Sequence, residues 1–347
     1  MTDLTRAYKE AGVDTEAAGG FVKRIKEIVK KTYIKGVISD IGLFGGMFKL
    51  DITTYSSPVL VASADGVGTK LKLAFEMQRH EGVGIDLVAM NVNDIVVHGA
   101  KPLFFLDYLA MGRLDTTKAE EIIKGIARGC EIAGCALLGG ETAELPGFYR
   151  EGEYELSGFC VGVTDNSRII DGSSIGVGNI IVGIASNGVH SNGFSLIRKI
   201  LKEKEIPLET TIENWEKTLG EELITPTKIY VPSILNILRD FEIKGMAHIT
   251  GGGFYENISR ILPRGVRARI DFYSWHKPPI FQWIKEMGNL SWEEMMAIFN
   301  CGIGFVLIVA KDQVDEVVGR LHGLKEEAWV IGEILKEDGS EKVEIYF

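Results

Sequence analysis

The stretch PVLVASADGVGTK at residues 58–70 shows the pattern on which the fold depends. An apolar run, Pro58–Ala64, leads directly into a turn that contains Gly66 and Gly68. A short apolar run that ends in glycines is typical of a buried strand. Glycines also let backbone N–H groups approach a ligand closely, because they have no Cβ. We therefore expect a buried strand whose last residues carry a ligand-binding turn.

Predicted helices and strands alternate after this stretch. Ile85–His98 is apolar on nearly every side, which indicates a buried helix, and Leu103–Met111 indicates a strand. Thr116–Ile132 has helical periodicity, with Thr116 or Thr117 as its expected N-cap. Such an order of elements is typical of layered folds that combine helices with a sheet.

The composition becomes polar and glycine-rich at Asp165–Gly178, where we place a boundary between residues 1–167 and residues 168–347. The second part begins with an expected strand at Ile180–Ala185 and an expected helix at Phe194–Lys204. Because both parts mix the two kinds of element, we expect a two-domain α/β or α+β protein. Periodicity alone does not decide between these two arrangements.

Overall charge and hydropathy argue against several classes of partner. The chain has 347 residues and a net charge of −10, so its overall field does not favour nucleic acid or an anionic membrane surface. It contains no run of about 18 apolar residues, which a membrane-spanning helix would need. The start has no apolar signal segment and the cysteines have no zinc-binding spacing, so we expect a cytoplasmic protein with reduced thiols. The cysteines are Cys130, Cys135, Cys160 and Cys301.

Three glycine-rich loops follow predicted strands: Asp65–Lys70, Gly139–Glu144 and Thr250–Gly253. Converging backbone N–H groups in such loops bind phosphate oxygens, and a helix N-terminus adds partial positive charge. Carboxylates beside a phosphate would repel it unless a divalent cation lies between them. We therefore expect a site for a nucleotide with Mg²⁺. The standard motifs G-x-x-x-x-G-K-[ST] and G-x-G-x-x-G are absent, so each loop alone is a weak signal.

The candidate metal ligands are Asp65, Asp94 and Glu141. Asp94 lies in an apolar helix, where an unpaired carboxylate is unfavourable, so we expect it to have a metal ion or a lysine as partner. Asp65 is equally suited to begin an Asx turn, and the alternative for Glu141 is a solvated loop acid. Taken together, the three carboxylates form the kind of set that Mg²⁺ binds beside phosphate and water.

The segment HSNG at His190–Gly193 is a second candidate centre. It precedes a predicted helix, so one interpretation is that Ser191 or Asn192 is the N-cap. His190 is also the kind of residue that transfers protons or stabilises a developing anion near neutral pH. The residues alone thus predict a two-domain enzyme that handles phosphates with Mg²⁺, and they leave its reaction open.

The sequence closely resembles the phosphoribosylformylglycinamidine cyclo-ligase family, also called aminoimidazole ribonucleotide synthetases. The resemblance extends over nearly the whole chain and rests on nine motifs in order. They are YKEAGVD (residues 8–14), SADGVGTK (63–70), GIDLVAMNVNDIVVHGAKPLFFLDY (84–108), GGETAELPG (139–147), GFCVGV (158–163), HSNG (190–193), PTKIYV (226–231), HITGGGFYENISRILP (248–263) and FNCGIG (299–304).

The resemblance implies the fifth step of purine synthesis. In this reaction ATP phosphorylates the formamide oxygen of formylglycinamidine ribonucleotide. The amidine nitrogen then attacks the same carbon, and phosphate leaves as aminoimidazole ribonucleotide forms. The resemblance also implies a homodimer whose N-terminal mixed sheets pair into a barrel, with ATP near the interface, and a C-terminal α+β domain. A kinase of the same superfold and a non-catalytic nucleotide-binding scaffold are the alternatives.

Matching the motifs position by position also assigns site residues. The resemblance places Lys26 on an N-terminal segment that closes over the nucleotide, and it directs a second group of side chains at the formyl amide. The residues expected at ATP and Mg²⁺ are Lys26, Asp65, Gly66, Gly68, Thr69, Lys70, Asp94, Glu141, Thr250, Gly251, Gly252 and Gly253, of which Asp65, Asp94 and Glu141 are the expected metal ligands. Those expected at the formyl amide are His190, Ser191 and Asn192.

Overall fold

The computed structural model describes residues 10, 15–339 and 341–347, so most of the YKEAGVD motif lies outside the described residues. The chain forms two compact units. The first comprises residues up to Ile95 together with Pro102–Asp165, and the second comprises Val96–Lys101 together with Asn166–Phe347. The boundary between residues 167 and 168 that the sequence suggests stays a prediction. Each unit is built around one sheet.

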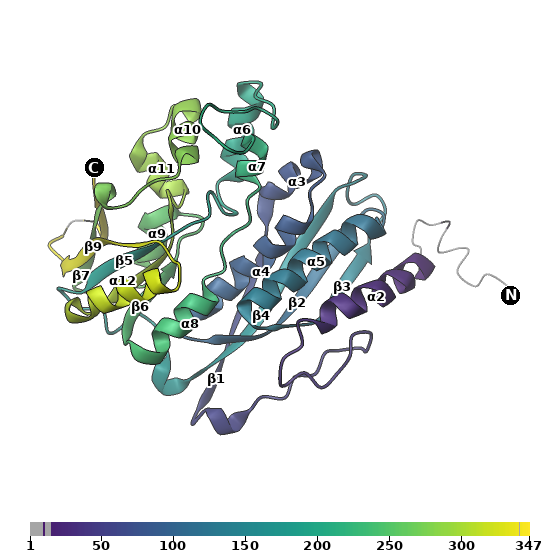
Figure 1. Ribbon diagram of the computed structural model, residues 1–347, viewed down its shortest axis with the longest axis horizontal. Coiled ribbons are helices and arrows are strands. Elements are labelled where there is room, and N and C mark those ends of the chain that lie inside the picture. The colour runs from purple at the N-terminus through teal and green to yellow at the C-terminus, as the bar shows by residue number, and fades with distance from the viewer. Residues whose placement is uncertain (1–9, 11–14, 340) are drawn as a thin grey trace. The chain divides into compact units, whose positions relative to one another are not determined.

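The first unit packs helices against a four-stranded mixed sheet of order β1-β4-β2-β3 (Figure 1). Strand β1 is antiparallel to β4, and β2 is parallel to β3. The contact between α4 and the sheet is close, because a Cβ at Gly158 would overlap Phe105 of β2 and approach Leu87 of α4. The elements are α2 (Thr15–Lys30), η1 (Ile52–Thr54), β1 (Pro58–Gly66), η2 (Gly68–Lys70), α3 (Leu71–Met77), α4 (Glu81–Val96), β2 (Lys101–Met111), α5 (Thr116–Ala133), β3 (Ala136–Glu144) and β4 (Tyr154–Asp165).

Strand β1 exists as predicted, but the prediction that it is buried is wrong. None of its nine residues is buried, and Leu60 is 61% exposed. The physical reason is its position at the edge of the sheet, where it pairs with β4 alone. An apolar run is compatible with either environment, because periodicity does not report which strand lies at an edge.

The second unit contains a six-stranded mixed sheet of order β10-β7-β9-β5-β8-β6. Strand β8 lies between β5 and β6, and all seven of its residues are buried. Two mixed sheets with their helices confirm the predicted mixed α/β fold. The elements are η3 (Asn166–Arg168), β5 (Ile180–Ala185), α6 (Phe194–Glu203), α7 (Leu219–Leu223), α8 (Val231–Asp240), β6 (Ile243–His248), α9 (Gly253–Ser259), β7 (Val266–Asp271), η4 (Phe272–Ser274), α10 (Pro279–Gly288), α11 (Trp292–Ile298), β8 (Ile303–Val309), η5 (Lys311–Gln313), α12 (Val314–Gly323), β9 (Ala328–Lys336) and β10 (Val343–Tyr346).

Two predicted helix caps are wrong. Helix α5 is capped by Asp115, whose carboxylate accepts hydrogen bonds from the backbone N–H groups of Thr117 and Lys118 at 3.1 and 3.2 Å. Helix α6 begins after Gly193, which has φ of 78° and provides no side-chain cap. The Ser191 hydroxyl lies instead 2.8 Å from the Thr227 hydroxyl. The Ser191 hydroxyl thus contacts a residue distant in sequence, although the local N-cap rule would assign this hydroxyl to the start of α6.

Candidate active site

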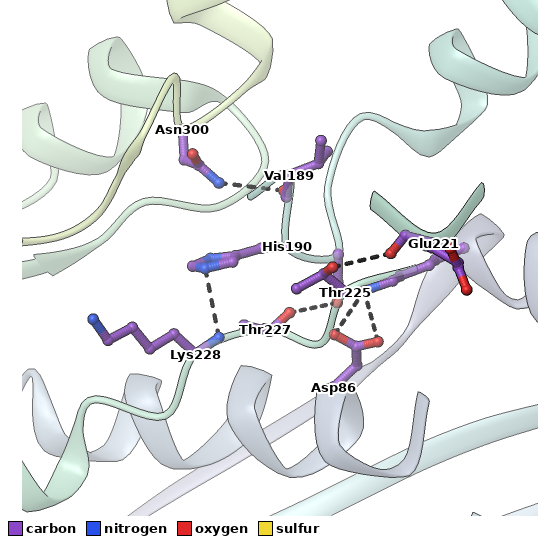
Figure 2. Close-up of polar contacts among 10 residues, drawn as sticks. Asp86, Val189, His190, Glu221, Thr225, Thr227, Lys228 and Asn300 are labelled. Atoms are coloured by element: carbon purple, nitrogen blue, oxygen red, sulfur yellow. Dashed lines mark hydrogen bonds and ion pairs between the residues drawn. The ribbon is translucent and has the colours of Figure 1, made fainter. Parts of the chain in front are cut away.

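The turn after β1 is anchored by a buried ion pair. The Lys70 Nζ lies 2.9 Å from Oδ1 and 2.8 Å from Oδ2 of Asp86 in α4, and neither side chain is exposed. Figure 2 shows the two contacts of the Asp86 carboxylate. Burial lowers the pKa of the Lys70 ammonium, and the charge of Asp86 opposes this shift. Lys70, expected at the phosphates, therefore has a carboxylate partner that the sequence analysis did not identify.

Asp65 is the second-last residue of β1, and its carboxylate accepts a hydrogen bond from the Gly66 N–H at 2.7 Å. The Asn91 carboxamide of α4 lies 3.5 Å from the Asp65 carbonyl oxygen. Asp94, half-buried, is three residues further along α4 and so lies on the same helix face as Asn91. The structure thus places the Asp65 turn beside the part of α4 that carries Asp94, with Gly68 and Thr69 exposed.

A cavity of about 520 Å³ opens between α2, residues 40–46 and the middle of β2 and β3, where Leu106, Asp107 and residues 137–142 line it. Its volume is in the range of small-molecule sites. Gly139, Gly140 and Glu141 line it, but they lie within β3, so the prediction that residues 139–144 form a loop after a short strand is wrong. The strand continues to Glu144 because these residues pair with β2. Lys26 of α2 forms an ion pair of 2.8 Å with Asp40, which also lines the cavity. The hydrogen bond that the partly exposed Lys26 ammonium donates to the Asp40 carboxylate raises the pKa of Lys26.

The buried carboxylate of Asp107 also lines this cavity. Its pKa is raised to about 7, mainly by burial; its own backbone N–H opposes the shift, and the nearby charge of Glu141 adds to it. A Cβ at Gly140, the partner of Asp107 in the β2–β3 register, would overlap this carboxylate. Gly140 is therefore glycine because a carboxyl group occupies the space beside its Cα.

The predicted metal ligands do not form a preassembled site. Within residues 10, 15–339 and 341–347, no three His, Cys, Asp or Glu side chains lie in a group that could hold a metal ion. Glu141 is exposed and Asp65 and Asp94 are half-buried. A divalent cation here would need further ligands from outside the protein, such as phosphate oxygens and water.

In the second unit, His190 is held by its neighbours (Figure 2). Its ring is buried, and its Nε2 accepts hydrogen bonds from the backbone N–H of Asn187 at 3.1 Å and of Lys228 at 3.5 Å. The Nζ of Lys228 forms an ion pair with Glu326. The motif PTKIYV therefore contributes a backbone N–H that fixes the imidazole.

The third glycine loop lies beside the HSNG segment. A Cβ at Gly251 would be 3.5 Å from the Oδ1 of Asn192, although about 60 residues separate them in sequence. The Asn257 carboxamide donates hydrogen bonds to the carbonyls of Thr250, Gly251 and Gly253 at 3.3, 3.2 and 2.8 Å. This buried side chain fixes the loop, so Asn192 and residues 250–253 share one rigid surface.

Comparison with known proteins identifies the chain. Residues 50–164 match the family described as AIR synthase related protein, N-terminal domain, and residues 176–344 match the C-terminal domain of the same description. A curated protein of Geotalea uraniireducens (strain Rf4), named phosphoribosylformylglycinamidine cyclo-ligase, is 57% identical over 347 residues, which cover 99% of this chain and 100% of that protein. The chain belongs to the phosphoribosylformylglycinamidine cyclo-ligase family.

Solved structures share the fold of this cyclo-ligase family member. Thiamine-monophosphate kinase from Stenotrophomonas maltophilia K279a has a TM-score of 0.70 at 19% identity, with 93% of this chain and 94% of that chain covered. The hydrogenase maturation protein HypE in complex with ATP has a TM-score of 0.65 at 13% identity, with 93% and 90% covered. At these identities the likeness concerns the fold alone.

Sequence reasoning missed three residues of the cyclo-ligase chain that the structure brings to the candidate centres. They are Asp86, Asp107 and Asn300. Asp86 and Asp107 lie in apolar segments of the sequence. Because burial of an unpaired carboxylate is unfavourable, the argument applied to Asp94 could have identified them as candidates too. Asn300 lies in the motif FNCGIG, but nothing local indicates which backbone groups its carboxamide contacts.

Proposed function

We propose that this chain catalyses the ATP-dependent cyclisation of formylglycinamidine ribonucleotide to aminoimidazole ribonucleotide, with release of ADP and phosphate. The observation that carries the proposal is 57% identity over the full length of a relative named for this ligase activity. The reaction needs an activated formamide oxygen, because an amide oxygen is a poor leaving group and its phosphate ester is a good one. The protein's part is then to position the reactants and stabilise charge.

The cavity between α2 and the middle of β2 and β3 is the proposed nucleotide site. It has the volume of a small-molecule site and two glycines of β3 at its wall, and Lys26 is paired with Asp40, which lines the cavity. Binding of ATP by a protein of the same fold, HypE, supports this assignment. The Lys26–Asp40 pair would position α2 against residues 40–46 so that they cover bound ATP.

Magnesium is the proposed metal. The donors fit an ion held mainly by ATP phosphates: Asp65, Asp94 and Glu141 offer carboxylates, and no complete protein site is present in the described part of the chain. When bound, Mg²⁺ neutralises phosphate charge. Glycines 66 and 68, Thr69 and residues 250–253 are proposed to contact phosphates, and Lys70 to act there through its pair with Asp86.

His190, Ser191 and Asn192 are proposed to face the formyl amide. His190 presents a neutral imidazole whose Nε2 is occupied by backbone donors, so the group that it offers is an N–H at Nδ1. Such a donor stabilises negative charge that develops on the formyl oxygen. Asn192 would add a carboxamide from the edge of the third glycine loop.

A homodimer in the cytoplasm completes the proposal. The sheet of the first unit has exposed apolar side chains on its edge strand and on β4 and β2, including Leu60, Phe159 and Tyr108 at 61%, 42% and 40%. Exposed apolar side chains gathered on one sheet are typical of an interface. The four cysteines are buried and free, as in a reducing compartment. No helix in the described residues is long and apolar enough to span a membrane.

The test is an assay on purified protein with Mg–ATP and formylglycinamidine ribonucleotide, following free phosphate and the aminoimidazole product together. Equal yields of both, dependent on both substrates, would support the proposal. Asp94→Asn is the matched inactive variant, expected to keep the fold. Phosphate without aminoimidazole would indicate another acceptor, and ATP binding without either product would indicate a scaffold.

A further inference from the structure

His190 has an unusual backbone conformation. Its φ is 64°, in the left-handed region that residues with a Cβ rarely adopt. Its ring is 1% exposed, and its Nε2 faces two backbone N–H groups, those of Asn187 and Lys228. Because a backbone N–H can only donate, Nε2 accepts, and the imidazole proton is on Nδ1. Strained conformations of this kind persist only where the surroundings enforce them.

Asn300 supplies that enforcement from the turn before β8. Its Nδ2 donates hydrogen bonds to the carbonyls of Gly188 and Val189 at 2.9 and 3.2 Å, and Figure 2 shows the contact with Val189. Its Oδ1 accepts from the Ser186 hydroxyl and the Gly302 N–H, each at 2.9 Å. The carboxamide is buried and ties residues 186–189 to the start of β8.

These four contacts use the full hydrogen-bonding capacity of a carboxamide, which has two donor hydrogens and two acceptor lone pairs. The Asn300 carboxamide has no donor or acceptor left for a substrate, so any effect of Asn300 on the reaction goes through residues 186–189, which it holds. That segment contains the Asn187 N–H, the nearer of the two donors to His190 Nε2. Strand β8 also leaves space for the imidazole of His190 by having glycine at position 304, where a Cβ would overlap both His190 and Tyr230.

We propose that Asn300 is a positioning residue for His190: it holds residues 186–189 so that His190 keeps its left-handed backbone and its Nδ1–H tautomer. The proposal rests on the proposed function in one respect, namely that His190 acts at the formyl amide. The positioning itself is a property of the protein without substrate, and it is measurable on its own.

The first test compares Asn300→Asp with Asn179→Asp. Asn300→Asp keeps an acceptor for Ser186 and Gly302 but places a carboxylate oxygen against the carbonyls of Gly188 and Val189. The Asn179 side chain accepts a hydrogen bond from Gly176 at 2.8 Å, which an aspartate can also accept, at the start of β5 and away from His190. We expect Asn300→Asp to lower kcat about 100-fold, as a small misplacement of a reacting group does, with KM for ATP nearly unchanged. Asn179→Asp should leave both constants unchanged.

The second test measures the tautomer of the His190 imidazole by ¹⁵N NMR of the full chain labelled at histidine. The His190 signals are assigned by their absence in His190→Gln. The Nδ1–H form is expected in the unsubstituted protein and in Asn179→Asp, and a mixture of tautomers in Asn300→Asp. If Asn300→Asp retains the Nδ1–H tautomer and its kcat, the proposal is overturned. It is also overturned if the unsubstituted protein shows the Nε2–H form.

Ser186→Ala covers the case in which Asn300→Asp does not fold. It removes one donor to Asn300 Oδ1, and a smaller loss of kcat, about tenfold, is expected for the loss of one hydrogen bond. An unchanged kcat and tautomer in this variant would count against the proposal. If the unsubstituted protein makes no aminoimidazole but shows the tautomer and its loss in Asn300→Asp, the proposed function fails and the positioning stands.

Discussion

Lys70 and Asp86 form an ion pair from which solvent is excluded, with Nζ 2.8 and 2.9 Å from the two carboxylate oxygens. Lys70 ends the 3-10 turn after β1, and Asp86 lies in α4. The pair therefore ties the first glycine turn to the helix that also carries Asp94. Removal of either charge would leave the other buried without its ion-pair partner, which is unfavourable.

We accordingly predict that Asp86→Asn lowers the free energy of unfolding by about 3–5 kcal/mol, as removal of one partner from a buried pair does. The double variant Lys70→Met/Asp86→Leu should recover most of this loss. Glu153→Gln is the matched control, because Glu153 pairs with Lys72 at 2.7 Å in a more exposed setting and should lose no more than about 1 kcal/mol. Urea unfolding of the three variants measures these differences. If Asp86→Asn lowers the free energy of unfolding by less than Glu153→Gln does, the prediction is wrong.

Asp107 should give the protein a pH-dependent stability. Burial raises its folded pKa from 3.8 to about 7, so the folded state binds more protons than the unfolded state between these values. The associated stability is present below pH 3.8 and is lost as the pH rises through about 7. Relative to Asp107→Asn, the unsubstituted protein should lose at most about 1.4 kcal/mol per pH unit across this window.

Urea unfolding at several pH values between 4.5 and 8 tests this for Asp107→Asn, with Asp312→Asn, which removes an exposed carboxylate, as the control. The difference between Asp107→Asn and the unsubstituted protein should grow with pH up to about 7 and then level off. A difference that is constant over the range would show that Asp107 is ionised throughout.

Features that depend on neighbouring residues could be predicted from the sequence, whereas features that depend on contacts between distant segments could not. The strand predicted at Leu103–Met111 is β2, and the predicted helix Thr116–Ile132 is α5, because periodicity is a property of neighbouring residues. The N-cap was missed by one residue, at Asp115. The exposure of β1 was missed because its edge position depends on the order of strands in the sheet.

In the candidate site, too, contacts between distant segments could not be predicted from the sequence. The loop predicted at Gly139–Glu144 was a weak candidate for phosphate binding, whereas the structure places Gly140 in β3 and gives it a packing reason, the carboxylate of Asp107 on the neighbouring strand. The approach of Asn192 to Gly251 joins two motifs that the sequence treated separately. Such relationships arise from parallel pairing and from loops that meet at one end of a sheet, neither of which a single segment reveals.

Lys26 offers a test of the nucleotide site. Lys26 forms an ion pair with Asp40, and both side chains are partly exposed, so the fold depends little on this pair. If Lys26 contacts the nucleotide as proposed, Lys26→Met should lower the affinity for Mg–ATP about tenfold or more, because it would remove a charge-assisted hydrogen bond to a phosphate. Lys23→Met, exposed on the same helix, is the control and should bind ATP normally. Calorimetric titration measures both, and equal affinities would remove Lys26 from the site.

Gly251 allows a test of the third glycine loop with little effect on the fold. Gly252 and Gly253 have φ of 88° and 56°, so a side chain there would be strained, whereas a Cβ at Gly251 would meet only the Oδ1 of Asn192 at an ordinary 3.5 Å. Gly251→Ala should therefore unfold at the same urea concentration as the unsubstituted protein. If the loop contacts a phosphate, the added methyl group prevents close approach of the backbone, and KM for one of the two substrates should rise about tenfold. Gly319→Ala in α12, where nothing lies within 4 Å of the added Cβ, should change neither KM. Unchanged KM values for both substrates in Gly251→Ala would show that the backbone at residue 251 touches no ligand, and the role of the loop would then be to support Asn192.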